Sequence, residues 1–407
     1  MAPLGLRVAY NVNMTQRRFL ARRLEGLVQS DIRRMTRECE RVGGINLGQG
    51  ICDMPTPPLV ARGAIEAIEA RRSIYSYPEG IRELRDAIAA KLARDNGITA
   101  DPQSQIVVTV GASGAYAATL HALLDPGDGI LLMEPYYGYH LNAAIVAGLE
   151  PQFLTLAPPR FTIDPAALRA ALRPNTRAIV CCTPSNPSGK MLDRAELELI
   201  AEVARENDLL VITDEIYEYI RYDGRAHISP ATVPGLAERT VSVMGLSKTF
   251  SITGWRLGWA VAPAELARAI TLVNDLYFVC APTPLQYGAA AGFGAPPAFF
   301  AELAATYERK RDLICAALDA GGMRPIVPQG AYYVLADVSH LGFATARDAA
   351  MNLLETRGVA SVPGSAFYRG SAGEGLLRFC FAKEDDVLEE ACRRLQSKGN
   401  SVVPAAL

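Results

Sequence analysis

The stretch MGLSKTFSITGWRLGW, residues 244–259, places one lysine and one arginine among small and hydroxyl side chains. Lys248 follows an apolar run, and removing a lysine from water lowers its pKa, so that the neutral amine can attack a carbonyl carbon and form an imine. Arg256 carries a planar guanidinium whose donors match a phosphate. Taken alone, the stretch is also compatible with an ordinary loop and a solvated lysine, so the rest of the chain has to decide.

A second segment suited to an anion is IVVTVGASGAYAATLHALL, residues 106–124. It reads as a strand, a Gly-rich turn and a helix, and a helix N-terminus offers unpaired amides and a positive dipole end. Gly111 and Gly114 do not form G-x-G-x-x-G, and no ribose-binding acid follows about 20 residues later. The segment therefore predicts an anion site and argues against a dinucleotide.

Between these stretches, apolar strands alternate with helical patterns. The expected strands are 130–133, 153–156, 178–182, 209–213 and 257–261, and the expected helices include 59–71, 164–172 and 193–206. This alternation is typical of an α/β fold with a mostly parallel sheet covered by helices on both faces, whose ligands bind at the carboxyl ends of the strands.

The last part of the chain has a different pattern. A long helical periodicity at 297–318 is followed by strands near 332–336 and 376–381, which predicts a smaller α+β domain. We expect residues 1–50 to form an N-terminal arm and the start of the small domain, 51–295 the large domain, and 296–407 the C-terminal small domain.

Composition limits the classes of function. The net charge of −2 argues against a nucleic acid partner. No apolar run approaches the roughly 18 residues that span a bilayer. The eight cysteines form no C-x-x-C pair and the histidines are isolated, so we expect no metal site, no disulfide framework and a reducing compartment, the cytoplasm.

Polar side chains stand where the expected strands end. Asp214 closes an apolar strand, and because an unpaired carboxylate there costs several kcal/mol, it needs a cationic partner or water. Glu215 and Glu218 are expected to be surface groups or to lie behind the site. Arg378 sits inside an apolar strand, where a buried arginine needs an anion, either an internal salt bridge or a ligand.

Four strings follow one another along the chain: NLGQG, TPSNPSG, TDEIY and SKTFSITGWRLG. Together, and in this order, they resemble the motifs of the class I and II aminotransferases, which are fold-type I enzymes that use pyridoxal phosphate. The resemblance extends from about residue 45 to about residue 395. One departure is Gly245, where the family usually has a serine whose hydroxyl contacts the phosphate. Water or a backbone amide is expected to replace that contact.

The resemblance implies a role for each matched residue at the cofactor. Lys248 forms the imine with the cofactor, Asp214 pairs with the pyridine nitrogen, and Tyr217 donates to the phenolic oxygen, lowering the pKa of the imine. The remaining contacts implied for the cofactor are the phosphate donors Arg256, Ser113 and the Ala112 amide, the stacked ring of Tyr137, and the Asn186 amide beside the phenolic oxygen.

The resemblance also implies the substrate contacts and the assembly. Arg378 holds the substrate α-carboxylate bidentately, Asn186 lies beside it, and Gly50 lets the backbone approach the carboxylate. Tyr75 reaches the cofactor phosphate of a neighbouring subunit, which implies a homodimer.

The implied activity is the transfer of an amino group from an L-amino acid to a 2-oxo acid by a ping-pong mechanism. β- or γ-elimination, replacement and cyclisation begin with the same loss of the Cα proton and remain open, as does a non-catalytic binding module of the same fold. The partners expected are therefore small amino and oxo acids, with no nucleic acid and no membrane.

Overall fold

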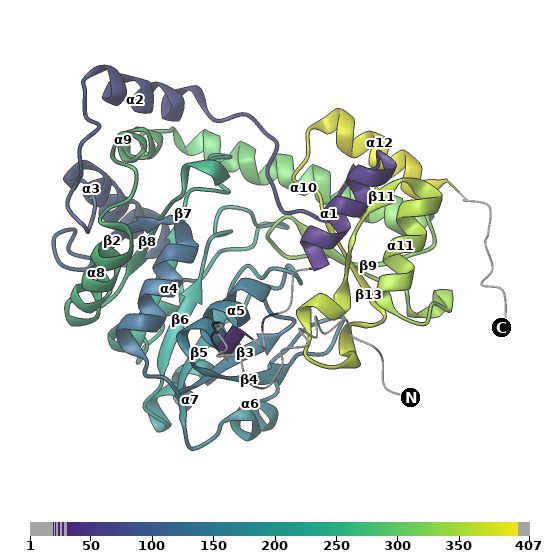
Figure 1. The fold of residues 1–407 in the computed structure, drawn as a ribbon, viewed down its shortest axis with the longest axis horizontal. Coiled ribbons are helices and arrows are strands. Elements are labelled where there is room, and N and C mark those ends of the chain that lie inside the picture. Colours follow the sequence, from purple (N-terminus) through teal and green to yellow (C-terminus); the bar gives the residue numbers. More distant parts are fainter. Residues whose placement is uncertain (1–18, 20, 22, 25–26, 28–30, 398–407) are drawn as a thin grey trace.

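The computed structural model describes residues 19, 21, 23–24, 27 and 31–397. Figure 1 shows two groups of strands and helices side by side, connected through the long helix α10 (Pro297–Ala320). We call the part built on the larger sheet the large domain and the part built on the smaller sheet the small domain. The boundaries expected from the sequence remain a prediction.

The larger sheet has seven strands in the order β2-β8-β7-β6-β5-β3-β4. Strand β8 is antiparallel to both β2 and β7, whereas all other neighbours run parallel. This confirms the expected mostly parallel sheet. The strands are β2 (Ile106–Val110), β3 (Gly129–Glu134), β4 (Glu150–Thr155), β5 (Thr176–Cys182), β6 (Leu210–Asp214), β7 (Thr240–Gly245) and β8 (Leu257–Val261).

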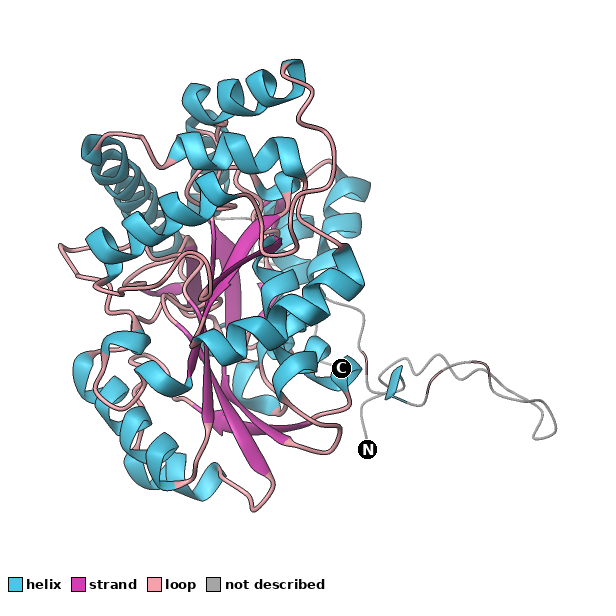
Figure 2. Cartoon of the chain, turned by 90° about the vertical axis from the view of Figure 1, so that its left-hand side faces the viewer, coloured by secondary structure: helices cyan, strands magenta, loops and turns pink. Residues whose placement is uncertain are grey.

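Helices cover both faces of this sheet, as Figure 2 shows. Because successive side chains of a strand point to opposite faces, Ala178 and Val180 of β5 pack with helices on one face, and Ile179 and Cys181 pack on the other. The first face is covered by α4 (Gly111–Leu123), α5 (Gly138–Ala147) and α8 (Ala264–Phe278), the second by α6 (Pro165–Ala171) and α7 (Arg194–Glu206). A further apolar cluster beside β2 and β8 contains side chains of α2 (Pro58–Glu69), α3 (Arg82–Lys91) and α9 (Thr283–Gly292).

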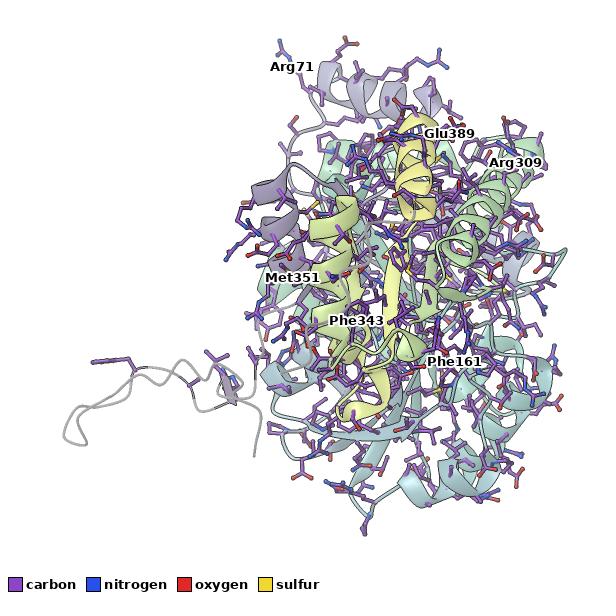
Figure 3. The ribbon with its side chains drawn as sticks, turned by 90° about the vertical axis from the view of Figure 1, so that its right-hand side faces the viewer. Arg71, Phe161, Arg309, Phe343, Met351 and Glu389 are labelled. Atoms are coloured by element: carbon purple, nitrogen blue, oxygen red, sulfur yellow. The ribbon has the colours of Figure 1, made fainter. Side chains whose placement is uncertain are left out.

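The small domain is built on an antiparallel sheet in the order β12-β13-β10-β9. Its strands are β9 (Arg324–Ile326), β10 (Tyr333–Asp337), β12 (Val362–Pro363) and β13 (Leu376–Cys380), and its helices are α1 (Asp31–Val42), α10, α11 (Ala346–Arg357) and α12 (Asp385–Gln396). A short parallel pair, β1 (Ile45–Asn46) with β11 (Val359–Ala360), attaches the early part of the chain to this domain. Figure 3 views this side, where Phe343 and Met351 pack against the core while Arg309 and Glu389 are exposed.

The observed ends of the elements differ little from the expected ones. The strand expected at 209–213 is β6 (Leu210–Asp214), so Asp214 is itself the last strand residue. The helix expected at 59–71 is α2 (Pro58–Glu69). In the part of the chain that the structure describes, no helix is both long and apolar enough to cross a membrane.

Candidate active site

The candidate site lies where three neighbouring strands of the large sheet end. Asn186 lies in the loop after β5, Asp214 ends β6, and Lys248 lies in the turn after β7. Because β5, β6 and β7 are adjacent and parallel, their carboxyl ends meet at one edge of the sheet. Residues far apart in the sequence are therefore brought to one place.

Lys248 points toward the segment after β1. Its Nζ donates to the carbonyl oxygen of Gly50 at 3.3 Å and lies 5.5 Å from the centroid of the Tyr332 ring. The Tyr332 hydroxyl donates to the same carbonyl at 3.1 Å. Burial lowers the pKa of the Lys248 ammonium. A larger fraction of Lys248 is therefore the neutral amine that imine formation requires than in a solvated lysine.

Asp214 has a partner that the sequence did not reveal. Its Oδ2 lies 3.0 Å from Nε2 of His140, and its Oδ1 accepts from the backbone amide of Ile216 at 3.2 Å. Both side chains are buried. His140 follows Tyr137 by three residues, a spacing that puts both near the start of α5, and this Tyr-x-x-His pattern was the available signal. The histidine supplies the polar partner that a buried carboxylate requires.

Tyr217 faces the same space and contacts a second tyrosine. Its hydroxyl donates to the hydroxyl of Tyr333 at 3.2 Å. Burial raises the pKa of Tyr217, and burial raises the pKa of Tyr333 to about 12, so both phenols keep their protons at neutral pH. A Cβ on Gly50 would lie 1.9 Å from the Tyr333 oxygen. Glycine is therefore required at position 50 for the backbone to pass this pair.

Arg378 crosses from the small domain into the site. Its Nη1 donates to Oδ1 of Asn186 at 2.9 Å, and its Nη2 donates to the carbonyl oxygen of Gly48 at 2.5 Å. The guanidinium lies against the rings of Tyr333 and Phe367 and is 1% exposed. None of the carboxylates in the described ranges forms an ion pair with Arg378, and its Nε has no hydrogen-bond partner there. The internal salt bridge left open by the sequence is therefore not seen.

Arg256 and Ser113 meet at the N-terminus of α4. Arg256 Nη2 donates to Ser113 Oγ at 2.9 Å, and its Nη1 donates to the carbonyl oxygen of Thr253 at 2.9 Å. Gly111 has a φ of +74°, and a Cβ there would lie 2.5 Å from Arg256 Nη2. A cation, a hydroxyl and the free amides of the first helical turn, including that of Ala112, thus face the same point, which suits a phosphate.

Of two further tyrosines expected at the site, Tyr137 lies there and Tyr75 does not. Tyr137 is partly buried at the start of α5 and lies in T-shaped contact with His140, at 5.2 Å between ring centroids. Tyr75 is 79% exposed, so a single chain does not bring it into the site. At Gly245, a Cβ would lie 2.9 Å from Ile216 Cδ1, so a larger residue there requires Ile216 to move.

The donor set can be compared with the cofactor that the sequence implies. Lys248, with its lowered pKa, matches an aldehyde, and Asp214, paired with His140, matches a pyridine nitrogen. Arg256, at the N-terminus of α4, matches a phosphate. The residues present therefore fit pyridoxal phosphate. The fold and these side chains are those of a fold-type I pyridoxal-phosphate enzyme.

A family model described as "Aminotransferase class I and II" matches residues 42–395, and the chain belongs to this family. It is 37% identical to a probable N-succinyldiaminopimelate aminotransferase of Mycobacterium tuberculosis, over 87% of this chain and 92% of that protein. It is 36% identical to aromatic-amino-acid aminotransferase 2 of Thermococcus litoralis, over 93% of this chain and 97% of that protein. The solved N-succinyldiaminopimelate aminotransferase of M. tuberculosis matches with a TM-score of 0.90 and 36% identity, covering 93% and 99% of the two chains. The chain is thus an enzyme, an aminotransferase of a pyridoxal-phosphate-dependent family.

Proposed function

We propose that this chain binds pyridoxal phosphate beside Tyr137 at the ends of β5, β6 and β7, and there moves an amino group from an L-amino acid to a 2-oxo acid. The observation that carries the proposal is that two cations donate to carbonyls of the same segment, residues 48–50. They are Lys248, whose pKa burial lowers, and Arg378, which is buried and has no carboxylate partner among the described residues. One group suits imine chemistry, and the other suits a substrate carboxylate.

The cofactor, when bound, supplies the electron sink that makes the substrate Cα proton removable. In our proposal the neutral amine of Lys248 would take that proton. Asp214, held by His140, would be the carboxylate opposite the pyridine nitrogen. Tyr217 keeps its proton and offers its O–H to the phenolic oxygen beside Asn186.

At the substrate end, we propose that the guanidinium of Arg378 binds the α-carboxylate. Its contacts with Asn186 and the Gly48 carbonyl fix the plane of the guanidinium, so that little side-chain entropy is lost when the substrate binds. One site then serves the amino donor and the oxo acceptor in turn, which gives ping-pong kinetics. The relatives named above differ in the amino donors their names state, so the proposal covers the α-amino and α-carboxylate groups that these donors share.

At the other end, we propose that Arg256, Ser113 and the Ala112 amide hold the phosphate. Arg256 is exposed and, within the described residues, is paired with no carboxylate. A serine at position 245 would require Ile216 to shift, and we propose that a water or a backbone amide makes the phosphate contact of the family serine.

The proposal extends to assembly and location. Tyr75 lies in an exposed apolar segment with Ile74 and Tyr77, each more than 70% exposed, which is unusual for a surface in contact with water alone. We propose that this segment meets a second copy and that Tyr75 contacts the neighbouring phosphate. All eight cysteines are free, which supports a place in the reducing cytoplasm.

The experiment that tests the proposed chemistry is chemical fixation. Protein reconstituted with pyridoxal phosphate is treated with borohydride, which reduces an imine to a stable amine, and the labelled peptide is identified by mass spectrometry. We expect the label on Lys248 and no label in Lys248→Ala. A label on a different lysine, with none on Lys248, would overturn the assignment.

A further inference from the structure

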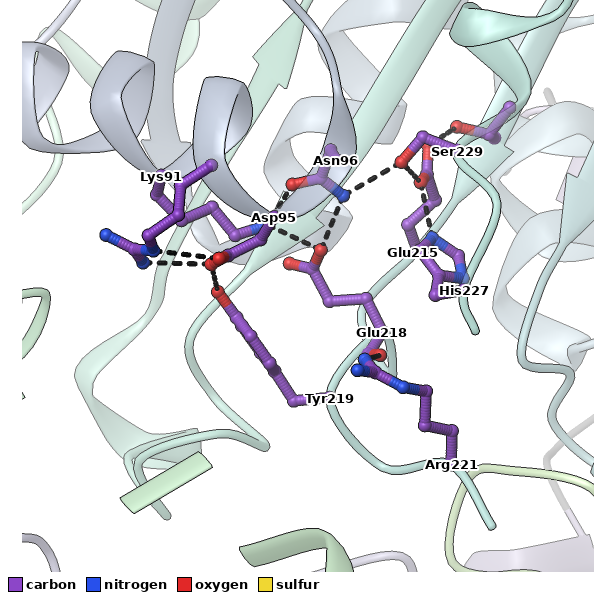
Figure 4. A network of polar contacts seen from close by, with 11 residues as sticks. Lys91, Asp95, Asn96, Glu215, Glu218, Tyr219, Arg221, His227 and Ser229 are labelled. Atoms are coloured by element: carbon purple, nitrogen blue, oxygen red, sulfur yellow. Dashed lines mark hydrogen bonds and ion pairs between the residues drawn. The ribbon is translucent and has the colours of Figure 1, made fainter. Parts of the chain in front are cut away.

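The turn that carries Asp214 and Tyr217 has a second side. Glu215 and Glu218 alternate with these two residues and point away from the site, into a cluster of polar side chains shown in Figure 4. The sequence left them either at the surface or behind the site, and their exposures of 0% and 4% exclude the surface. The reason is the geometry of the turn, which directs neighbouring side chains to opposite sides.

Glu218 is paired with a lysine that is completely shielded from water. Lys91, the last residue of α3, is 0% exposed, and its Nζ donates to Glu218 Oε2 and, at 2.5 Å, to Oδ1 of Asn96. Asn96 ends a π-helical turn, Leu92–Asn96, and its Nδ2 donates to the same Glu218 oxygen at 2.7 Å. The carboxylate is thus held by two residues of another part of the chain.

Glu215 is held in a similar way by the loop beyond the turn. Its Oε2 accepts from Ser229 Oγ at 2.6 Å and lies 2.7 Å from His227 Nε2, and its Oε1 accepts from Thr213 Oγ1 at 2.7 Å. Burial acts to raise the pKa of Glu215, but the contacts with His227, Ser229 and Thr213 outweigh it, and the pKa lies below its ordinary value. Glu215 is therefore a buried carboxylate in its charged form.

Ser229 joins the two halves into one network. It accepts from Asn96 Nδ2 at 2.8 Å and donates to Glu215. We call this set the buried network, and its members are Lys91, Asn96, Glu215, Glu218, His227 and Ser229. Burying ions is costly, and well-packed apolar residues often stabilise a fold as well or better. General stability is therefore a weak explanation for it.

Its attachment points suggest another explanation. Glu215 directly follows Asp214, and Glu218 directly follows Tyr217, so the network holds the main chain at both residues that face the cofactor position. A displacement of about 1 Å at such residues can cost roughly 100-fold in rate. We propose that the buried network is a positioning device, which fixes Asp214 and Tyr217 where they meet the cofactor. This rests on the proposed function, since it assumes that pyridoxal phosphate binds there.

The first test uses a spectroscopic property that does not change when a substitution only lowers the stability of the fold. The pH midpoint of the visible absorbance of the bound cofactor depends on the hydrogen bond from Tyr217 to the phenolic oxygen. Losing a hydrogen bond worth about 1 kcal/mol raises that midpoint by roughly 0.7 pH unit. We expect Tyr217→Phe to raise the midpoint by this whole amount. Glu218→Gln and Ser229→Ala should each raise the midpoint by at least about half as much. Ser229→Ala breaks the network without leaving a charge unpaired, so it serves if Glu218→Gln folds poorly.

The matched control is Gln152→Leu. Gln152 on β4 is 1% exposed and forms hydrogen bonds with Asn175 and Thr176 at the start of β5, away from the turn. It should lower thermal stability without shifting the midpoint. Hydrogen exchange of the apoprotein provides a readout without cofactor. Amides of residues 214–220 should exchange faster in Glu218→Gln and Ser229→Ala, but not in Gln152→Leu.

A double variant decides whether the network acts through Tyr217. If it does, Glu218→Gln should cause no further midpoint shift in a Tyr217→Phe background. An unchanged midpoint in both network variants, or an equal shift in Gln152→Leu, would each overturn the proposal. Additive shifts in the double variant would overturn its Tyr217 part and assign the effect to Asp214. Wild-type protein that takes up no pyridoxal phosphate would overturn the proposed function itself, which separates the two failures.

Discussion

Arg378 on β13 of the small domain donates to Oδ1 of Asn186, in the loop after β5 of the large domain, at 2.9 Å. The contact joins the two domains at the site with a charged group whose counter-ion is absent from the described residues. Since a buried cation without an anion is costly, this arrangement makes a carboxylate-bearing ligand favourable. In the proposed function, the two domains thus build the substrate end of the site together.

Replacing Arg378 tests this arrangement. Arg378→Lys keeps the charge but loses the planar fork, so we expect kcat/KM for the amino donor to fall about 100-fold or more. Cofactor uptake should stay unchanged. The control is Arg309→Lys, an exposed position on α10, which should remain within about twofold of wild type. Steady-state kinetics measures both, and equal losses in the two variants would contradict the role of Arg378.

The pair of His140 and Asp214 leads to a second prediction. His140→Ala removes one hydrogen bond to a buried carboxylate, which is worth about 1.5–3 kcal/mol, so we expect kcat to fall roughly 10- to 100-fold. Asp214→Asn removes the charge itself and should cost more. Single-turnover kinetics with saturating donor measures the effect on chemistry. A larger loss in His140→Ala than in Asp214→Asn would contradict this order.

Lys248 gives a prediction for the apoprotein that depends on pH. Burial lowers its pKa in the folded state below the ordinary value of 10.5, so between these two values the unfolded chain binds more protons. The contribution of Lys248 to stability therefore improves as pH rises through that interval, and at lower pH its burial is a penalty. Lys248→Met lacks the penalty. In urea unfolding, the free energy of unfolding of Lys248→Met should exceed that of wild type most at about pH 7, and this difference should shrink as pH rises. A gain that grows with pH would contradict the sign.

A complementation experiment tests the proposed dimer and Tyr75. Lys248→Ala lacks the lysine proposed to form the imine, and Tyr75→Ala lacks the residue proposed to reach the neighbouring phosphate. If Tyr75 acts across the interface, each mixed dimer has one site that carries neither defect, so random reassociation restores about a quarter of the wild-type sites. Activity after mixing, set against each variant alone at subsaturating cofactor, measures this. No recovery, together with native mass spectrometry that shows mixed dimers, would contradict action across the interface.

The sequence predicted the strand ends well for a physical reason. Lys248, Asp214 and Asn186 each follow an apolar run in a βαβ pattern, and parallel topology alone brings such ends to one edge. No long-range contact has to be known to place these residues near one another. The mostly parallel sheet was predictable on the same basis, and the smaller α+β domain was predictable from the long helical periodicity at 297–318 and the strands that follow it.

The contacts between distant segments could not be predicted in this way. His140 reaches Asp214 across 74 positions and Tyr333 reaches Tyr217 across 116. The Tyr-x-x-His pattern does not say which carboxylate His140 meets, and no pattern marks Tyr333. Glu215 and Glu218 have the composition of a surface turn, and only the fold shows that Ser229 and Lys91 bury them. Pairings of this kind depend on the three-dimensional packing of several loops.

The most direct test of the central claim is a half-reaction. Purified protein loaded with pyridoxal phosphate is mixed with one amino acid at a time, without an oxo acid, while the absorbance of the cofactor is followed and the products are identified. We predict that certain L-amino acids convert the cofactor to pyridoxamine phosphate and leave one equivalent of 2-oxo acid. Release of ammonia with the cofactor unchanged would contradict transamination and assign the chain to elimination chemistry.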